Sequence, residues 1–151
     1  MDKILILMAC GRNDRGKLFP RAKRQLEHLQ HPIAKIAGNL DMHNCAVFHD
    51  GSPEAIETIT IMGIPDNGER EFLMASLKTG PDEYELNKTF RLVEDIEKPV
   101  IVLVLDHVYA SQFASFYLDR LEKSVEAHHL SEGEAVIVEA DGTFHLLSPQ
   151  D

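Results

Sequence analysis

The stretch "ILILMACGRNDRGKLFPRAKRQLEHL", residues 4–29, decides the fold of this chain. It opens on a short, continuous apolar run that predicts a buried β-strand over residues 3–8. Apolar residues then recur at spacings of three and four from Pro20 to Ala37, which predicts an amphipathic helix with proline in its first turn. Pro32 lies inside this pattern and predicts a kink or break near His28.

The alternation of strand and helix continues along the chain. Further strands are predicted at 44–49, at 100–105 and in a hairpin that turns at Asp141-Gly142, and further helices at 52–63, 86–96 and 111–125. Residues 69–77 could form another helix, stopped by Gly80-Pro81. We therefore expect one α/β domain over residues 1–151, with three α/β/α layers and a largely parallel sheet.

Composition narrows the classes of function. The 151 residues carry a net charge of −10, which argues against general nucleic-acid binding, and no apolar run is long enough to cross a membrane. The two cysteines do not make a disulfide framework, so we expect a reducing cytoplasm. No motif indicates a cofactor.

Basic residues gather directly after the first strand. Six of the 15 lysines and arginines lie between Arg12 and Arg24, where Asp14 is the only acidic residue. Clustered positive charge on an acidic protein raises the local concentration of anions, so Arg12, Arg15 and Lys17 are candidate ligands for a small anion. The alternative is a solvated helix face with no ligand.

The pattern Gly11-x-x-x-x-Gly16-Lys17 is typical of a phosphate-binding P-loop. A P-loop needs a serine or threonine next, because that hydroxyl holds the magnesium ion. Leu18 occupies the position and cannot bind a hard cation. We therefore interpret the pattern as a coincidence.

Three blocks of the chain, in order, point to a family. They are "ILILMACGRNDRGKLFPRAKRQLEHL" at 4–29, "VFHDGSPEAIETITIMG" at 47–63 and "PVIVLVLDHVYASQFASFYL" at 99–118. Together they resemble the histidine phosphatase superfamily, most closely its short phosphohistidine-phosphatase branch. The resemblance implies a phosphoglycerate mutase-like fold.

The resemblance also implies which residues should carry the family's chemistry. That chemistry uses a nucleophilic histidine, two arginines that bind the phosphoryl oxygens, and a second histidine. The first arginine corresponds to Ala9, the nucleophile to Cys10 and the second arginine to Glu54, or to a neighbour of Glu54 if the loop differs in length. His107 matches the second histidine, and Asp106 replaces the glycine before it. The pattern indicates a dismantled catalytic pocket.

Three hypotheses follow. The first is a non-catalytic protein that binds a small anion or a protein partner near Arg12, Arg15, Lys17, Asp106 and His107. The second is residual phosphatase chemistry, on phosphohistidine or a phosphoester, through a Cys10 thiolate or His107.

The third hypothesis is a metal site at the carboxyl ends of the strands. Zinc accepts thiolate, imidazole and carboxylate ligands. Residues of these types map to one edge of the predicted sheet: Cys10, His49, Glu54 and His107, with Asp50 and Asp106 beside them.

Overall fold

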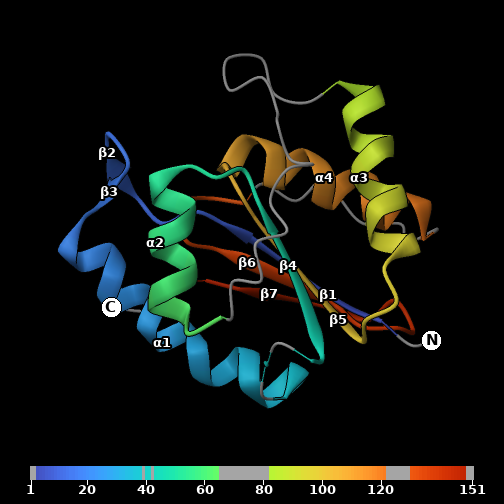
Figure 1. Cartoon of the computed structure of the whole chain (residues 1–151), viewed down its shortest axis with the longest axis horizontal. Helices are drawn as coiled ribbons and strands as arrows, with labels where there is room; N and C mark the ends of the chain where they lie inside the picture. The colour runs from blue at the N-terminus through green and yellow to red at the C-terminus, as the bar shows by residue number, and fades with distance from the viewer. Residues whose placement is uncertain (1–2, 39, 42, 65–81, 122–129, 149–151) are drawn as a thin grey trace.

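The computed structural model describes residues 3–38, 40–41, 43–64, 82–121 and 130–148. A five-stranded sheet forms its centre, in the order β4 (Cys45–His49), β5 (Val100–Leu105), β1 (Ile4–Ala9), β6 (Ala135–Val138) and β7 (Phe144–Leu147). Strands β4, β5 and β1 run parallel, whereas β6 and β7 pair antiparallel with their neighbours (Figure 1). The sheet is therefore mixed, with its parallel part where the sequence predicted it.

In the described part of the chain, four helices cover the two faces of the sheet (Figure 1). Helices α1 (Pro20–Ala37) and α2 (Pro53–Met62) pack on one face, and α3 (Glu83–Asp95) and α4 (His107–Arg120) pack on the other. This arrangement confirms the predicted three-layer α/β/α architecture. None of the helices in the described part of the chain is long and apolar enough to span a membrane.

Alternation along the strands divides the core into two halves. In β1, Ile6 and Met8 join the cluster under α1 and α2, while Leu5 and Leu7 join the cluster under α4. All four side chains are at most 1% exposed. Burying one such side chain stabilises the fold by about 1.5–3 kcal/mol, so the apolar strands fix the sheet between its two helical layers.

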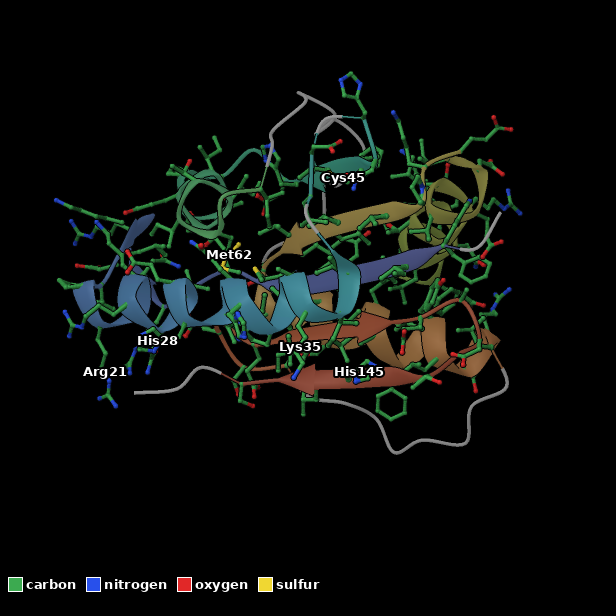
Figure 2. The ribbon with its side chains drawn as sticks, turned by 90° about the horizontal axis from the view of Figure 1, so that it is seen from below. Arg21, His28, Lys35, Cys45, Met62 and His145 are labelled. Atoms are coloured by element: carbon green, nitrogen blue, oxygen red, sulfur yellow. The ribbon has the colours of Figure 1, made fainter. Side chains whose placement is uncertain are left out.

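Helix α1 is continuous, and the predicted break near His28 is wrong. Figure 2 shows one helix that passes both His28 and Lys35. Pro32 removes one hydrogen bond of the helix, but Leu29 and Ile33 are buried against the sheet on either side of it. Packing of this apolar face holds the helix together across the proline.

The other helices begin and end at recognisable signals. Ser52 caps α2 by accepting a hydrogen bond from the Ala55 backbone N–H (3.3 Å), and Gly63 ends it in the left-handed region at φ 68°. Helix α4 begins at His107, one turn before the predicted start, because Asp106 caps it. The predicted helix at 69–77 and the predicted end of α4 at 125 lie outside the described residues.

Candidate functional site

The carboxyl ends of β1, β4 and β5 lie side by side. The register pairs Ala9 with Leu105, and His49 with Val104. The residues that follow these strands therefore meet at one edge of the sheet, which is where ligands bind in α/β sheets of this kind. The sequence predicted this edge as the candidate site.

Cys10 lies at the centre of the edge. It is 4% exposed, and its backbone is held on both sides: its N–H donates to the Leu105 carbonyl (2.8 Å), and its carbonyl accepts from the Gly133 N–H (3.0 Å). Burial raises the pKa of the thiol well above its ordinary value, and three carboxylates nearby, those of Asp50, Glu54 and Asp106, raise it further. Cys10 is therefore a protonated, poorly nucleophilic thiol at neutral pH.

Asp106 and His107 form the β5 side of the site. One carboxylate oxygen of Asp106 accepts hydrogen bonds from the backbone N–H groups of Val108 (3.1 Å) and Tyr109 (3.4 Å), which caps α4. The other oxygen lies 3.5 Å from Nδ1 of His107, whose side chain is 38% exposed. The imidazole therefore stands at the open side of the edge with a carboxylate beside it.

Glu54 comes from the first turn of α2 and is partly covered by the loop after β1. A Cβ atom placed on Gly16 would lie 3.0 Å from Cβ of Pro53 and 3.3 Å from a carboxylate oxygen of Glu54. The backbone N–H of Gly11 donates to the hydroxyl of buried Thr58 (3.2 Å). These contacts dock the loop on α2 and place it against the Glu54 carboxylate.

The P-loop pattern corresponds to a tight β-hairpin. Strands β2 (Asn13–Asp14) and β3 (Lys17–Leu18) pair antiparallel across a two-residue turn. Both turn residues are in the left-handed region, Arg15 at φ 53° and Gly16 at φ 87°, as a type I′ hairpin turn requires. A P-loop instead leads directly into a helix, so the interpretation of the pattern as a coincidence is confirmed.

The structure divides the basic residues between two places. Arg12 lies over the ring of Phe19, with 5.9 Å from its guanidinium carbon to the ring centroid. These two residues line a surface groove of about 490 Å³ together with Arg21, Ala22 and Gln25. Arg15 and Lys17 belong to the hairpin and are not among the residues that line this groove.

We call this feature the Arg12–Phe19 groove. Sequence reasoning overlooked Phe19, although an aromatic residue next to the first turn of a basic helix was a usable signal. The ring is 41% exposed, which is unusual among the large apolar side chains of this protein. The anion-binding roles predicted for Arg12, Arg15, Lys17, Asp106 and His107 remain predictions.

The predicted metal ligands do not come together as a metal site. Among the described residues, no three His, Cys, Asp or Glu side chains are placed to hold a metal ion. His49 is completely buried, and its Nδ1 accepts a hydrogen bond from the Gly51 N–H (3.0 Å). The predicted set of Cys10, His49, Glu54 and His107 is therefore not assembled.

Ala9 stands at the position where the resemblance implies a phosphate-binding arginine. It is 0% exposed and packs in the core cluster under α4. A guanidinium there would need space and hydrogen-bond partners inside an apolar cluster. This side of the site is therefore an extension of the core.

Comparison with known proteins supports the fold. No protein-family model matches the chain, and no curated protein matches its sequence. Two solved structures of proposed phosphohistidine phosphatases called SixA do match. The one from Nakamurella multipartitia has a TM-score of 0.65 at 12% identity and covers 100% of this chain and 96% of its own. The one from Agrobacterium tumefaciens has a TM-score of 0.61 at 11% identity, with 99% and 98% covered.

A third solved structure, phosphoglycerate mutase from Plasmodium falciparum, has a TM-score of 0.57 at 16% identity and covers 97% of this chain and 89% of that one. At such low identities a structural match shows the architecture alone. The architecture agrees with the sequence blocks at 4–29, 47–63 and 99–118. The chain therefore has the fold of the histidine phosphatase superfamily.

Proposed function

We propose that this chain is a non-catalytic protein with a histidine phosphatase fold, which binds an anionic ligand or partner beside its altered pocket. The observation that carries the proposal is the charge around Cys10. Asp50, Glu54 and Asp106 all lie near enough to raise the pKa of its thiol. Carboxylates thus stand where phosphoryl transfer needs fixed positive charge.

The expected loss of transition-state stabilisation argues against efficient catalysis. Removing one preorganised stabiliser of transition-state charge typically costs about 3–4 kcal/mol, or 10²- to 10³-fold in rate. Here Ala9 and Glu54 occupy both arginine positions of the resembling family, and Cys10 occupies that of the nucleophile. A carboxylate also repels the phosphoryl group itself, most strongly where water is excluded.

The anion-binding part of the proposal is supported by the Arg12–Phe19 groove. Among the described residues, its lining contains two arginines, one exposed aromatic ring and no carboxylate. Its volume of about 490 Å³ falls in the range of small-molecule sites, roughly 300–1,000 Å³. An arginine presents a planar fork of donors that matches phosphate or carboxylate oxygens.

The enzymatic alternative is residual phosphoryl chemistry through His107. It is favoured by the names of two structural neighbours, which are proposed phosphohistidine phosphatases. It is also favoured by the partial exposure of the His107 imidazole. In this alternative the imidazole would have to accept the phosphoryl group with Asp106 next to it and without an adjacent arginine at Ala9 or Glu54.

A hydrolysis assay separates the two. Purified wild-type protein is incubated with phosphohistidine, phenyl phosphate and small sugar phosphates, and phosphate release is followed by ³¹P NMR. We expect no release above the rate without protein. Release by the wild type that disappears in Cys10→Ser or His107→Ala would establish the enzymatic alternative and reject our proposal. Arg91→Ala, on the far face of the sheet, is the matched control.

A further inference from the structure

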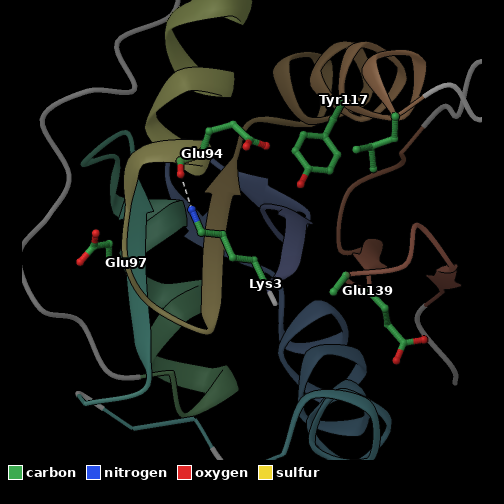
Figure 3. Close-up of a pocket in the computed structure, with 7 residues that line it drawn as sticks. Lys3, Glu94, Glu97, Tyr117 and Glu139 are labelled. Atoms are coloured by element: carbon green, nitrogen blue, oxygen red, sulfur yellow. Dashed lines mark hydrogen bonds between the residues drawn. The ribbon is translucent and has the colours of Figure 1, made fainter. Parts of the chain in front are cut away.

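Figure 3 shows a second cavity, which lies at the opposite end of β1 from Cys10. Lys3 borders it and precedes β1, while Cys10 follows that strand. The strand between them has six residues, so the two ends are about 20 Å apart. The cavity has a volume of about 450 Å³ and is lined by Lys3, Glu94, Glu97, Tyr117, Leu121, Glu139 and Ala140. Neither the family resemblance nor the proposed function assigns it a role.

Among the described residues that line this cavity, three are acidic and one, Lys3, is basic, so negative charge prevails there although Lys3 keeps its own charge. The ammonium of Lys3 donates to the backbone carbonyls of Val93 (2.9 Å) and Glu94, at the carboxyl end of α3. Glu139 pairs with the imidazole of His145 (2.9 Å). Among the described residues, the carboxylates of Glu94 and Glu97 have no hydrogen-bond or ion-pair partner. Two carboxylates are thus available to a cationic ligand.

Tyr117 gives a second and independent indication of a ligand. The residue is 8% exposed, and its ring packs against Phe90 and Phe113, with centroid distances of 5.6 and 5.8 Å. Its hydroxyl nevertheless points into the cavity (Figure 3), and within the described part of the chain it has no hydrogen-bond partner. The hydroxyl oxygen is not enclosed by protein, because it opens into the cavity. A ligand donor in the cavity can therefore reach it.

Tyr117 stays neutral in this environment. Burial, together with the nearby carboxylate of Glu94, raises its pKa to about 12. The phenol oxygen can therefore accept a hydrogen bond from a ligand at physiological pH. Because the ring is fixed by its aromatic neighbours, the hydroxyl is held in place before any ligand arrives.

The spacing of the acidic groups selects the kind of cation. Among the described residues, no three acidic, His or Cys side chains converge as metal ligands, so a single metal ion does not fit. The carboxylates are spread around a cavity that Leu121 and Ala140 also line. A flexible aliphatic chain with several ammonium groups can reach separate carboxylates and place its methylene groups on these apolar side chains.

We propose that this cavity binds a small aliphatic polyamine. One ammonium group contacts Glu94 and donates a hydrogen bond to the Tyr117 hydroxyl, and a second contacts Glu97. Glu139 contributes less, because one of its carboxylate oxygens already contacts Nε2 of His145 (2.9 Å). The proposal is independent of the function proposed above, since the two sites lie at opposite ends of β1.

Titration calorimetry of the full chain with spermidine tests the site. We expect Glu94→Gln and Glu97→Gln each to weaken binding about 10-fold, the scale of a lost hydrogen bond to a charged group. Tyr117→Phe keeps the ring and should weaken binding about 5-fold by removing the hydroxyl alone. Glu27→Gln, an equal change of charge on exposed α1, should leave the affinity unchanged.

The outcomes that overturn the proposal are specific. One is the absence of spermidine binding. Another is an equal loss of affinity in Glu27→Gln and Glu94→Gln, because binding would then be general attraction to an acidic protein. A third is displacement of spermidine by magnesium at the same ionic strength, which would make the site one for metal ions. Tyrosine fluorescence gives an independent readout, since the chain has no tryptophan and only three tyrosines.

Discussion

Leu103 in the middle of β5 and Asp106 just beyond its end are three residues apart, yet they are constrained in different ways. Leu103 is 0% exposed and must fill space between the strands and the helices. Asp106 caps a helix and contributes negative charge to Cys10. Many apolar side chains satisfy the first requirement, but one changed charge alters the second. The fold can thus persist while the chemistry of its edge changes.

The largest expected effect comes from the interior. Leu103→Ala removes a fully buried side chain from a central strand and should lower the free energy of unfolding by about 3 kcal/mol. The matched substitution Leu146→Ala, at a residue 46% exposed on β7, should cost less than about 1 kcal/mol. Urea unfolding followed by circular dichroism measures both. Equal losses would mean that β5 is not central to the core.

The second prediction concerns ligand binding beside the edge. If the Arg12–Phe19 groove binds anions, Arg12→Ala should weaken the binding of phenyl phosphate about 10-fold, because it removes a charged donor. Arg15→Ala, in the nearby hairpin, changes charge equally and should have a smaller effect. Chemical-shift titration of the ¹⁵N-labelled protein gives both affinities. A larger loss in Arg15→Ala would place the anion at the hairpin.

A smaller effect on stability than that of Leu103→Ala is expected at the edge itself. Asp106→Ala removes the cap of α4 and should cost about 1 kcal/mol. Asp106→Asn keeps a capping oxygen and removes only the charge, so it should be nearly neutral for stability. Both variants should lower the pKa of Cys10, because each removes one of the carboxylates that raise it. An unchanged Cys10 pKa in Asp106→Asn would show that burial alone sets it.

Much of the fold could be predicted because local signals agreed with the packing. The run "VIVLVL" at 100–105 is β5, and Ser52-Pro53 opens α2 as predicted. The errors have local causes. At Pro32 the buried face of α1 outweighed the missing hydrogen bond, and at Asp106 a capping aspartate was overlooked, so α4 begins earlier than expected.

The candidate site was only partly predictable. Parallel strands align their carboxyl ends, which was enough to bring Cys10, Glu54 and Asp106 to one edge. Whether four ligand-type residues converge on one point depends on side-chain directions that a sequence does not contain, and among the described residues no three such side chains are placed to hold a metal ion. The cavity lined by Lys3, Glu94 and Tyr117 was not predicted, because its lining comes from segments far apart in sequence.

The state of the Cys10 thiol tests the central claim most directly. In a Cys45→Ser background, the ¹³Cβ shift of Cys10 is followed from pH 6 to pH 10, so the readout does not depend on access of a reagent. Burial and three carboxylates raise the pKa, so we predict no thiolate at neutral pH and a midpoint above that of a free cysteine. A thiolate already formed at pH 7 would reveal net positive charge at this edge and contradict the account.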